Sequence, residues 1–266
     1  MKAVELAVAQ EAMGAEANPA AHARTCSFIP NEHPILLPSS DFAIRARRGE
    51  PRFYGKFRMR DNVDPWGLAP AELRKLRGLK TPHGIQRLLD DMPYHLADSA
   101  WSPRRVLREN TSHCYEGALF AAAALRVIGY PPLIVDLEAE HDTDHVIAVY
   151  RVDGHWGSVA KSNYTGCRYR EPVYRSLREL ALSYFDVYFN LRGERTLRTF
   201  SRPVHMKRFD SLNWMTTEKP VWFVAEYLLT ISHTSLISRA QAKRLHRLDG
   251  RSFRAGCLER AQKSSL

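Results

Sequence analysis

Apolar residues at helical spacing predict several helices in the first half of the chain. Residues 69–79 and 85–92 carry apolar side chains three and four positions apart, which is typical of short amphipathic helices. A longer helix is expected to begin near His113 and to end at Gly129, because glycine suits the left-handed position after a helix and the prolines that follow prevent its continuation. Residues 118–125 are apolar on every side, so this helix is predicted to be buried.

Alternating and β-branched segments predict strands directly after the buried helix. Residues 133–139 and 145–152 are expected to form two strands, and Asp153-Gly154 is a tight-turn signal that leads into a third strand over residues 155–162. Residues 173–189 place apolar side chains on one face at helical spacing and predict an amphipathic helix. Helices and antiparallel strands in separate blocks predict an α+β fold.

The sequence divides into three segments of different character. Residues 1–40 are rich in alanine, proline and asparagine and are expected to be a loosely ordered leader. Residues 41–194 contain the pattern of helices and strands and are expected to form the core domain. Residues 195–266 are expected to be a helical extension that packs on the core. Within it, residues 221–229 fit a helix or a strand, and residues 239–248 fit a basic helix.

Composition is that of an ordinary globular protein and excludes several classes. Of the 266 residues, 44% are hydrophobic and 26% are charged. No apolar run reaches the roughly 20 residues that cross a bilayer, so no membrane partner is expected, and acidic residues interrupt the N-terminal segment where a signal peptide would be apolar. The cysteines are far apart, which argues against a disulfide framework or a zinc ribbon and favours the reducing cytoplasm. They are Cys26, Cys114, Cys167 and Cys257.

The formal net charge is +10, and the basic residues are dispersed along the chain. Dispersed charge is typical of a solvated surface, and no RRM, KH or zinc-finger motif is present, so nucleic-acid binding is not favoured although the basic charge permits it. The densest basic stretch covers residues 239–256. Arg104, Arg105 and Arg108 shortly precede Cys114, so they either make a nearby cleft cationic, which favours an anionic substrate, or are solvated.

Cys114 is the first candidate for chemistry. A cysteine at the start of a capped helix has a lowered pKa, because the unpaired backbone N–H groups and the helix dipole favour the thiolate. The same N–H groups can hold the oxyanion of a tetrahedral intermediate. The alternative is that Cys114 is a small buried side chain without a chemical role, as most free cysteines are.

His145 is the candidate base for this cysteine. A nucleophilic cysteine needs a group that accepts its proton, and that group is usually a histidine. His145 opens a predicted strand after the acidic segment 138–144, and a strand beside the buried helix would present it to Cys114. The alternative is a surface histidine at the end of a strand.

Two segments of the chain resemble the transglutaminase-like superfamily. In residues 113–135 a cysteine on a buried helix is followed by glycine, proline and a strand, and in residues 144–159 an Asp-His pair opens a strand that turns into a Gly-His-Trp segment. The resemblance covers the central part of the chain. It implies a papain-like α+β core with a nucleophile helix packed on an antiparallel sheet. It also implies that Cys114 is the nucleophile and that His145 is the general base.

The chain departs from the family pattern at the acid that orients the histidine. With Trp156 matching the family's tryptophan, this acid falls at Ala160. Asn163 is the nearest polar substitute, because papain-like enzymes orient the imidazole with asparagine. Asn163 is three residues after position 160, so in a regular strand the two side chains face opposite sides, and the role requires a bend or the end of the strand. The alternative is that Asn163 is a turn residue. The other candidates for the orienting role are Ser162, Asp136, Asp142 and Asp144.

An oxyanion site needs a donor besides the backbone N–H group of Cys114. Trp101 and Asn110 lie shortly upstream and are the candidates for contacts with the oxyanion or the substrate. The alternatives are a core tryptophan and a loop asparagine.

The sequence leaves three classes of function open. The first is thiol-dependent acyl transfer to, or hydrolysis of, a peptide, amide or ester through an acyl-enzyme, with no cofactor or metal. The second is a non-catalytic binding or scaffold domain on the same fold, because the expected acid is missing. The third is a metal site, since His113, Cys114, His141, Asp142 and His145 are suitable ligand types, although their spacing matches no standard zinc motif.

Overall fold

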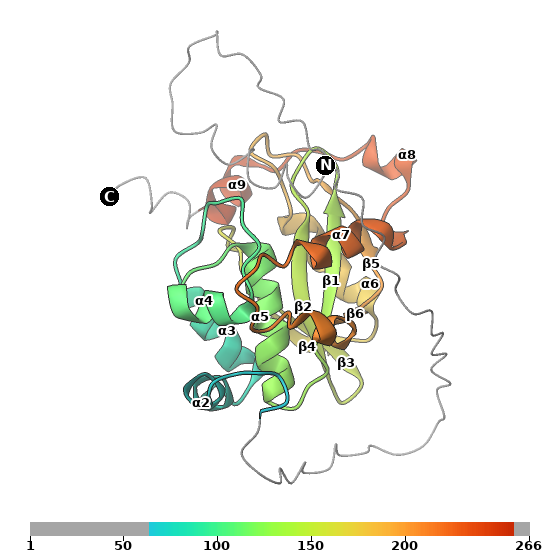
Figure 1. The fold of residues 1–266 in the computed structure, drawn as a ribbon. Helices are drawn as coiled ribbons and strands as arrows, with labels where there is room; N and C mark the ends of the chain where they lie inside the picture. Colours follow the sequence, from blue (N-terminus) through green and yellow to red (C-terminus); the bar gives the residue numbers. More distant parts are fainter. Residues whose placement is uncertain (1–63, 258–266) are drawn as a thin grey trace, which may run out of the picture.

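The structure is a computed structural model that describes residues 64–257 of the chain. The predicted leader over residues 1–40 and the first part of the predicted core lie outside the described residues. Within residues 64–257, helices pack on an antiparallel sheet (Figure 1). The predicted α+β class is therefore confirmed. No helix in this part of the chain is long and apolar enough to cross a membrane.

The sheet has the strand order β4-β3-β2-β1-β5-β7, and neighbouring strands are antiparallel. The central strands β1 (Leu133–Ala139) and β2 (His145–Val152) have the bounds that the sequence predicts. After the turn at Asp153-Gly154 the chain forms β3 (His155–Val159), which is shorter than predicted, and β4 (Arg170–Tyr174) forms one edge of the sheet.

The C-terminal part of the chain completes the sheet. β5 (Leu197–Ser201) and β6 (Val204–His205) pair one after the other with β1, and β7 (His233–Ser235) pairs with β5. Residues 195–257 are therefore not the purely helical extension that the sequence predicts, because the buried strand β1 needs backbone partners on both sides. The helices of this part are η2 (Met206–Leu212), α7 (Trp222–Thr230), α8 (Arg239–Ala242) and α9 (Gly250–Gly256).

The single helix predicted over residues 173–189 is wrong. The segment contains the end of β4, α6 (Leu177–Leu182) and the short 3-10 helix η1 (Phe185–Val187). Tyr174 pairs with Trp156 in the sheet, and the Ser176 side chain caps the start of α6 by accepting a backbone hydrogen bond. Strand pairing and a local cap thus divide a segment whose apolar spacing alone indicates one helix.

The helix that carries Cys114 is α5 (Cys114–Val127), and it is buried as predicted. Residues 118–125 are fully buried, and the small alanine side chains allow neighbouring elements to approach closely. Figure 1 shows α5 beside β1 and β2, with three shorter helices packed on its other side. These helices are α2 (Pro70–Gly78), α3 (Pro82–Asp91) and α4 (Pro103–Glu109).

The sheet separates two apolar cores. Val146 and Ala148 of β2 belong to the core between the sheet and α5. Ile147 and Val149 belong to the core on the opposite face, which α6 covers. Because successive strand residues face opposite sides, the His145 side chain lies on the α6 side of the sheet.

Candidate active site

Cys114 occupies the first position of α5 and is 6% exposed. The Glu116 carboxylate accepts a hydrogen bond from the backbone N–H of His113 at 3.4 Å and so closes the start of the helix. One turn later, a Cβ atom added at Gly117 would come within 2.4 Å of the Lys161 Cβ. The start of α5 is therefore packed tightly on the segment that follows β3.

That segment leaves the sheet and is fixed to α3. The backbone N–H and carbonyl of Ala160 both bond to the Gln86 side chain, each at 3.0 Å. Lys161 is 4% exposed, and its ammonium group donates to two backbone carbonyls at the end of α3, at 2.6 and 2.5 Å. Position 160, where the family pattern has its acid, is thus a buried alanine in a structural contact. Asn163 lies beyond the end of β3.

The Cys114 thiol is protonated at neutral pH. Burial raises the pKa of the thiol to about 11, which is opposite to the lowering expected at the start of a helix. Hydrogen bonds from the Tyr94 hydroxyl and from the backbone N–H groups of Tyr115 and Val146 oppose this rise. The loss of hydration outweighs these donors and the helix dipole.

The His145 ring is buried, and its Nε2 lies 2.9 Å from the carbonyl oxygen of Cys167. A carbonyl can only accept, so Nε2 carries the hydrogen and Nδ1 is the acceptor of the neutral ring. Within residues 64–257 this is the one hydrogen bond of the ring. Burial lowers the pKa of His145 to about 4, against the effect of the Cys167 carbonyl, and the charge of Arg170 lowers it further. The ring is therefore neutral at pH 7.

Two cavities meet at Cys114. The first, here called the histidine cavity, has a volume of about 40 Å³ and is lined by Cys114, His145, Ser162, Asn163, Cys167 and Tyr188 among others. The second, here called the aromatic cavity, has a volume of about 60 Å³ and is lined by His95, His113, Cys114, Tyr115, Asp136 and Trp222 among others. Tyr94, Thr143 and Asp144 line both cavities. Cys114 therefore borders both cavities.

The structure brings three of the predicted site residues together. Cys114, His145 and Asn163 line the histidine cavity. In the described part of the chain, neither Cys114 nor Asn163 is hydrogen-bonded to the His145 ring. Their catalytic roles therefore stay predictions.

Trp101 and Asn110 are not among the residues that line the two cavities. The Trp101 ring packs on His95, with ring centroids 4.1 Å apart, and the Arg105 guanidinium lies 4.4 Å from its centroid. Asn110 ends α4 in the left-handed conformation, with φ at 55°. Both residues thus have structural contacts, and their predicted roles at the oxyanion or the substrate stay predictions.

Tyr94 is the side-chain donor that the sequence did not indicate. It lies in the loop after α3, which bridges to Ser112 just before α5 and so brings the Tyr94 hydroxyl to the Cys114 sulfur. A single tyrosine in a loop carries no motif. Its role depends on a contact between segments that the sequence does not relate.

A backbone carbonyl takes the place of the missing acid at His145. Cys167 supplies this oxygen, and a main-chain atom leaves no residue-type signal in the sequence. The side chains considered for the orienting role bind other groups. Asp136 pairs with His233 at 3.1 Å, Asp142 accepts from the Thr196 hydroxyl at 2.7 Å, Asp144 from the Ala139 N–H at 2.8 Å and Ser162 from the Tyr164 N–H at 3.0 Å.

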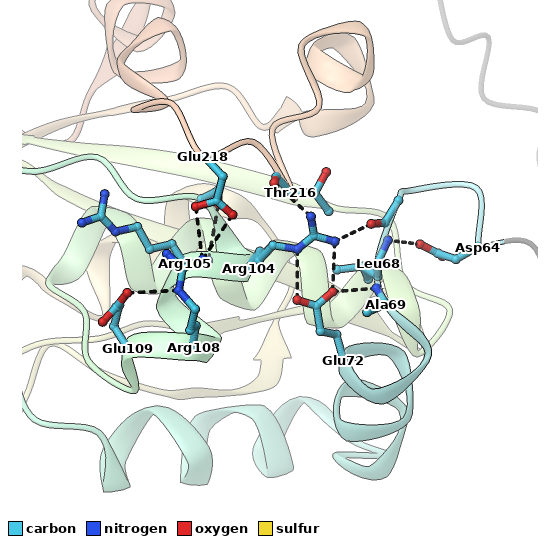
Figure 2. A network of polar contacts seen from close by, with 12 residues as sticks. Asp64, Leu68, Ala69, Glu72, Arg104, Arg105, Arg108, Glu109, Thr216 and Glu218 are labelled. Atoms are coloured by element: carbon cyan, nitrogen blue, oxygen red, sulfur yellow. Dashed lines mark hydrogen bonds and ion pairs between the residues drawn. The ribbon is translucent and has the colours of Figure 1, made fainter.

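Two of the three arginines of α4 form ion pairs in the network of Figure 2. Arg104 pairs with Glu72 at 3.0 Å, and Arg108 pairs with Glu218 at 3.2 Å. Arg105 packs on Trp101. In the part of the chain that the structure describes, no lysine or arginine lines either cavity. The alternative of a cationic cleft at Cys114 is therefore wrong.

The alternative of a metal site is not supported. Among residues 64–257, no three side chains of His, Cys, Asp or Glu come close enough to hold a metal ion. His113 lines the aromatic cavity and His145 the histidine cavity, so the ligand types that are near in sequence are divided between two sides of Cys114.

Comparison with known proteins assigns no family to the chain. No protein-family model matches it, and no curated protein matches its sequence.

Proposed function

We propose that the chain is a cysteine-dependent acyl-transfer enzyme with a papain-like core of the transglutaminase-like type. Cys114 forms an acyl-enzyme with a peptide, amide or ester substrate, and water or another acceptor releases it. The observation that carries this proposal is the hydrogen bond between His145 Nε2 and the Cys167 carbonyl. It leaves Nδ1 as a proton acceptor in a ring that lines the same cavity as Cys114.

The Cys167 carbonyl orients His145 in place of a side-chain acid. Like a carboxylate, it accepts the Nε2 hydrogen and fixes the tautomer of the ring. It carries no full charge, so it stabilises the imidazolium less than an acid does. The site is therefore a Cys-His pair with a weak orienting group.

The proton moves during the attack, because thiol and imidazole are both neutral at rest. As the Cys114 sulfur bonds to the carbonyl carbon of the substrate, its proton passes to His145 Nδ1, and the C=O electron pair moves to oxygen. The C=O bond then reforms, the leaving amine or alcohol departs with the Nδ1 proton, and a thioester remains. Water or another acceptor attacks the thioester and gives its proton to Nδ1. This proton returns to the sulfur as the thioester bond breaks.

The groups that donate hydrogen bonds to the Cys114 sulfur in the free protein also hold the oxyanion. The Tyr94 hydroxyl and backbone N–H groups at the start of α5 surround Cys114 in the free protein. A substrate oxygen next to the sulfur accepts from the same groups, which stabilise the tetrahedral intermediate.

The mechanism requires a reduced thiol at Cys114. Cys114 and Cys167 are both free cysteines in the structure, although they line the same cavity. A reducing compartment such as the cytoplasm maintains this state, and we include a cytoplasmic location in the proposal.

A second candidate function is a binding domain with an inactive site. The raised pKa of Cys114 favours it, because a protonated thiol is a poor nucleophile. So does the lack of a Cys114–His145 hydrogen bond among the described residues.

Acyl-enzyme trapping distinguishes the two functions. The protein is treated with p-nitrophenyl acetate, and peptide mapping identifies the acetylated residue in wild type, Cys114→Ala and the matched variant Cys167→Ala. We expect acetylation of Cys114 in wild type and in Cys167→Ala, since this substitution keeps the backbone carbonyl. Ester turnover by Cys114→Ala at the wild-type rate, or no acetyl group on Cys114, would favour the binding domain.

A further inference from the structure

We propose that the aromatic cavity binds the cationic side chain of a peptide substrate, an arginine or a lysine, next to the acyl group that reacts at Cys114. The reaction step rests on the proposed function, whereas the binding step is independent of it. The carboxylates and the aromatic rings of this cavity support a cation, and one of the rings has an unsatisfied acceptor.

The charge of the cavity is opposite to that of the chain. The formal net charge of the protein is +10, yet three aspartates line the aromatic cavity, and no lysine or arginine does so among the described residues. The aspartates are Asp98, Asp136 and Asp144. Asp136 and Asp144 are held in place by His233 and by the Ala139 N–H. These contacts position the two carboxylates. Asp136 raises the pKa of His233, so its charge is balanced when that ring is protonated, whereas the Asp98 carboxylate is exposed.

A row of stacked rings forms one wall of the cavity. His95 and His113 have centroids 6.0 Å apart, His113 and Tyr115 6.3 Å, and Tyr115 and Trp222 6.4 Å, with interplanar angles of 26°, 20° and 11°. All four rings line the cavity. Aromatic faces attract ammonium and guanidinium groups, and planar guanidinium groups stack on them.

His113 contributes an unsatisfied hydrogen-bond acceptor. Its Nε2 lies 2.9 Å from the Ser99 carbonyl and therefore carries the hydrogen. Its Nδ1 is buried and has no hydrogen-bond partner within residues 64–257. Burial lowers the pKa of His113, so the ring is neutral and Nδ1 accepts. A buried acceptor without a partner is unfavourable, and this acceptor belongs to a ring that lines the cavity.

The apolar residues of the cavity suit the alkyl stem of such a side chain. Val146, Ala225, Leu228 and Leu229 line the cavity, and Leu229 is 46% exposed. Lysine and arginine both bury an apolar stem and present a charged head. The volume of about 60 Å³ corresponds to roughly four water molecules, which is the scale of one side chain.

The bound cation is a recognition group and not the attacking nucleophile. Carboxylates and ring faces favour the charged form of an amine. An amine must be neutral to attack a thioester, so a cavity of this kind suppresses attack by the group it holds. The cation therefore belongs to the acyl donor, and the cavity determines which acyl groups reach Cys114.

The test compares a cationic ligand with its neutral isostere. Binding of N-acetyl-arginine amide and N-acetyl-citrulline amide is measured by calorimetry at fixed ionic strength, in wild type and in Cys114→Ala. Asp98→Asn removes one exposed carboxylate of the cavity, and Asp91→Asn removes an exposed carboxylate at the end of α3 as the matched control. We expect arginine amide to bind about tenfold more tightly than citrulline amide. Asp98→Asn should reduce this preference severalfold, and Asp91→Asn should leave it unchanged.

Equal affinity for the two amides, no detectable binding of either, or an equal effect of the two aspartate variants would overturn the inference. Two mixed results separate it from the proposed function. Acetylation of Cys114 without an arginine preference overturns the cation site alone. An arginine preference without acetylation of Cys114 supports the cation site and overturns the acyl-transfer mechanism.

Discussion

The two cavities that meet at Cys114 are built from different chemistry. The histidine cavity contains an imidazole, an amide and a backbone carbonyl, which are groups that accept and orient protons. The aromatic cavity contains stacked rings and carboxylates, which are groups that hold a cation. We infer that the histidine cavity serves the reaction and the aromatic cavity serves substrate recognition, with the buried Cys114 sulfur between them.

Strand β2 produces this separation. His145 and Val146 are neighbours in the sequence, but they line different cavities, because successive strand residues face opposite sides of the sheet. The start of α5 lies at the beginning of β2, where the backbone N–H of Val146 bonds to Cys114, and Cys114 lines both cavities. The predictions below test the two sides of this arrangement separately, except at Tyr94, which lines both cavities.

The largest expected effect on stability is a loss in acid on the histidine side. His145 has a pKa of about 4 in the folded chain against an ordinary value of 6.5, so the unfolded chain binds a proton that the folded chain does not. Stability from this group is complete above pH 6.5 and is lost as the pH falls towards 4, by about 3 kcal/mol. Urea unfolding at several pH values should show a shallower pH dependence in His145→Gln than in wild type. The matched variant His155→Gln should keep the wild-type dependence, and an unchanged dependence in His145→Gln would contradict the prediction.

Tyr94 lines both cavities, and removing its hydroxyl group tests the proposed oxyanion site. Tyr94→Phe removes the hydroxyl that bonds to the Cys114 sulfur and should slow acetylation of Cys114 by about 100-fold. The rate is measured from the p-nitrophenolate released in a single turnover. Asn110→Ala should not change it, because Asn110 is not among the residues lining either cavity. A larger effect of the asparagine variant would restore the role expected from the sequence.

On the aromatic side, Glu116 supports the row of rings. Its carboxylate is fully buried and accepts from the Ser99 hydroxyl at 2.7 Å and from the Trp101 N–H at 2.9 Å. In Glu116→Gln the remaining oxygen can keep both bonds, but an NH2 group replaces the Oε2 oxygen that accepts from the backbone N–H of His113, so the free energy of unfolding should fall by about 1 to 3 kcal/mol. Urea unfolding measures the change.

Glu218→Gln is the matched control for that measurement. Glu218 is exposed in the α4 network of Figure 2, and its loss should change stability by less than about 0.5 kcal/mol. Equal effects of the two glutamate variants would show that the buried carboxylate is not a support of the aromatic wall.

The smallest effect of a cavity residue on the acetylation rate is expected at Asn163. Because the Cys167 carbonyl orients His145, Asn163→Ala should slow acetylation by less than about threefold. The same single-turnover assay measures this rate. A drop as large as that of Tyr94→Phe would return the orienting role to Asn163.

Local signals explain what could be predicted from the sequence. Gly129 and the prolines after it mark the end of α5, and Asp153-Gly154 fixes the turn after β2, so both elements agree closely with the structure. The pairing of β5 and β7 with the sheet depends on contacts between distant residues, and no local pattern reveals it.

Local signals also allowed the sequence to indicate two residues of the candidate site, but not their surroundings. Cys114 and His145 carry residue-type signals and lie at element starts, and they line one cavity. The raised pKa of Cys114 was not predictable, because burial depends on tertiary packing. The contributions of Tyr94 and of the Cys167 carbonyl depend on loops that only the folded chain brings together.

The most direct test of the account is the single-turnover acetylation rate of Cys114 in His145→Gln. The rate is compared with those of wild type and of the matched variant His155→Gln, with peptide mapping to confirm the modified residue. The account predicts a rate about 10² to 10⁴ times lower in His145→Gln, because the general base is lost, and an unchanged rate in His155→Gln. Acetylation of Cys114 at the wild-type rate in His145→Gln would contradict the Cys-His mechanism.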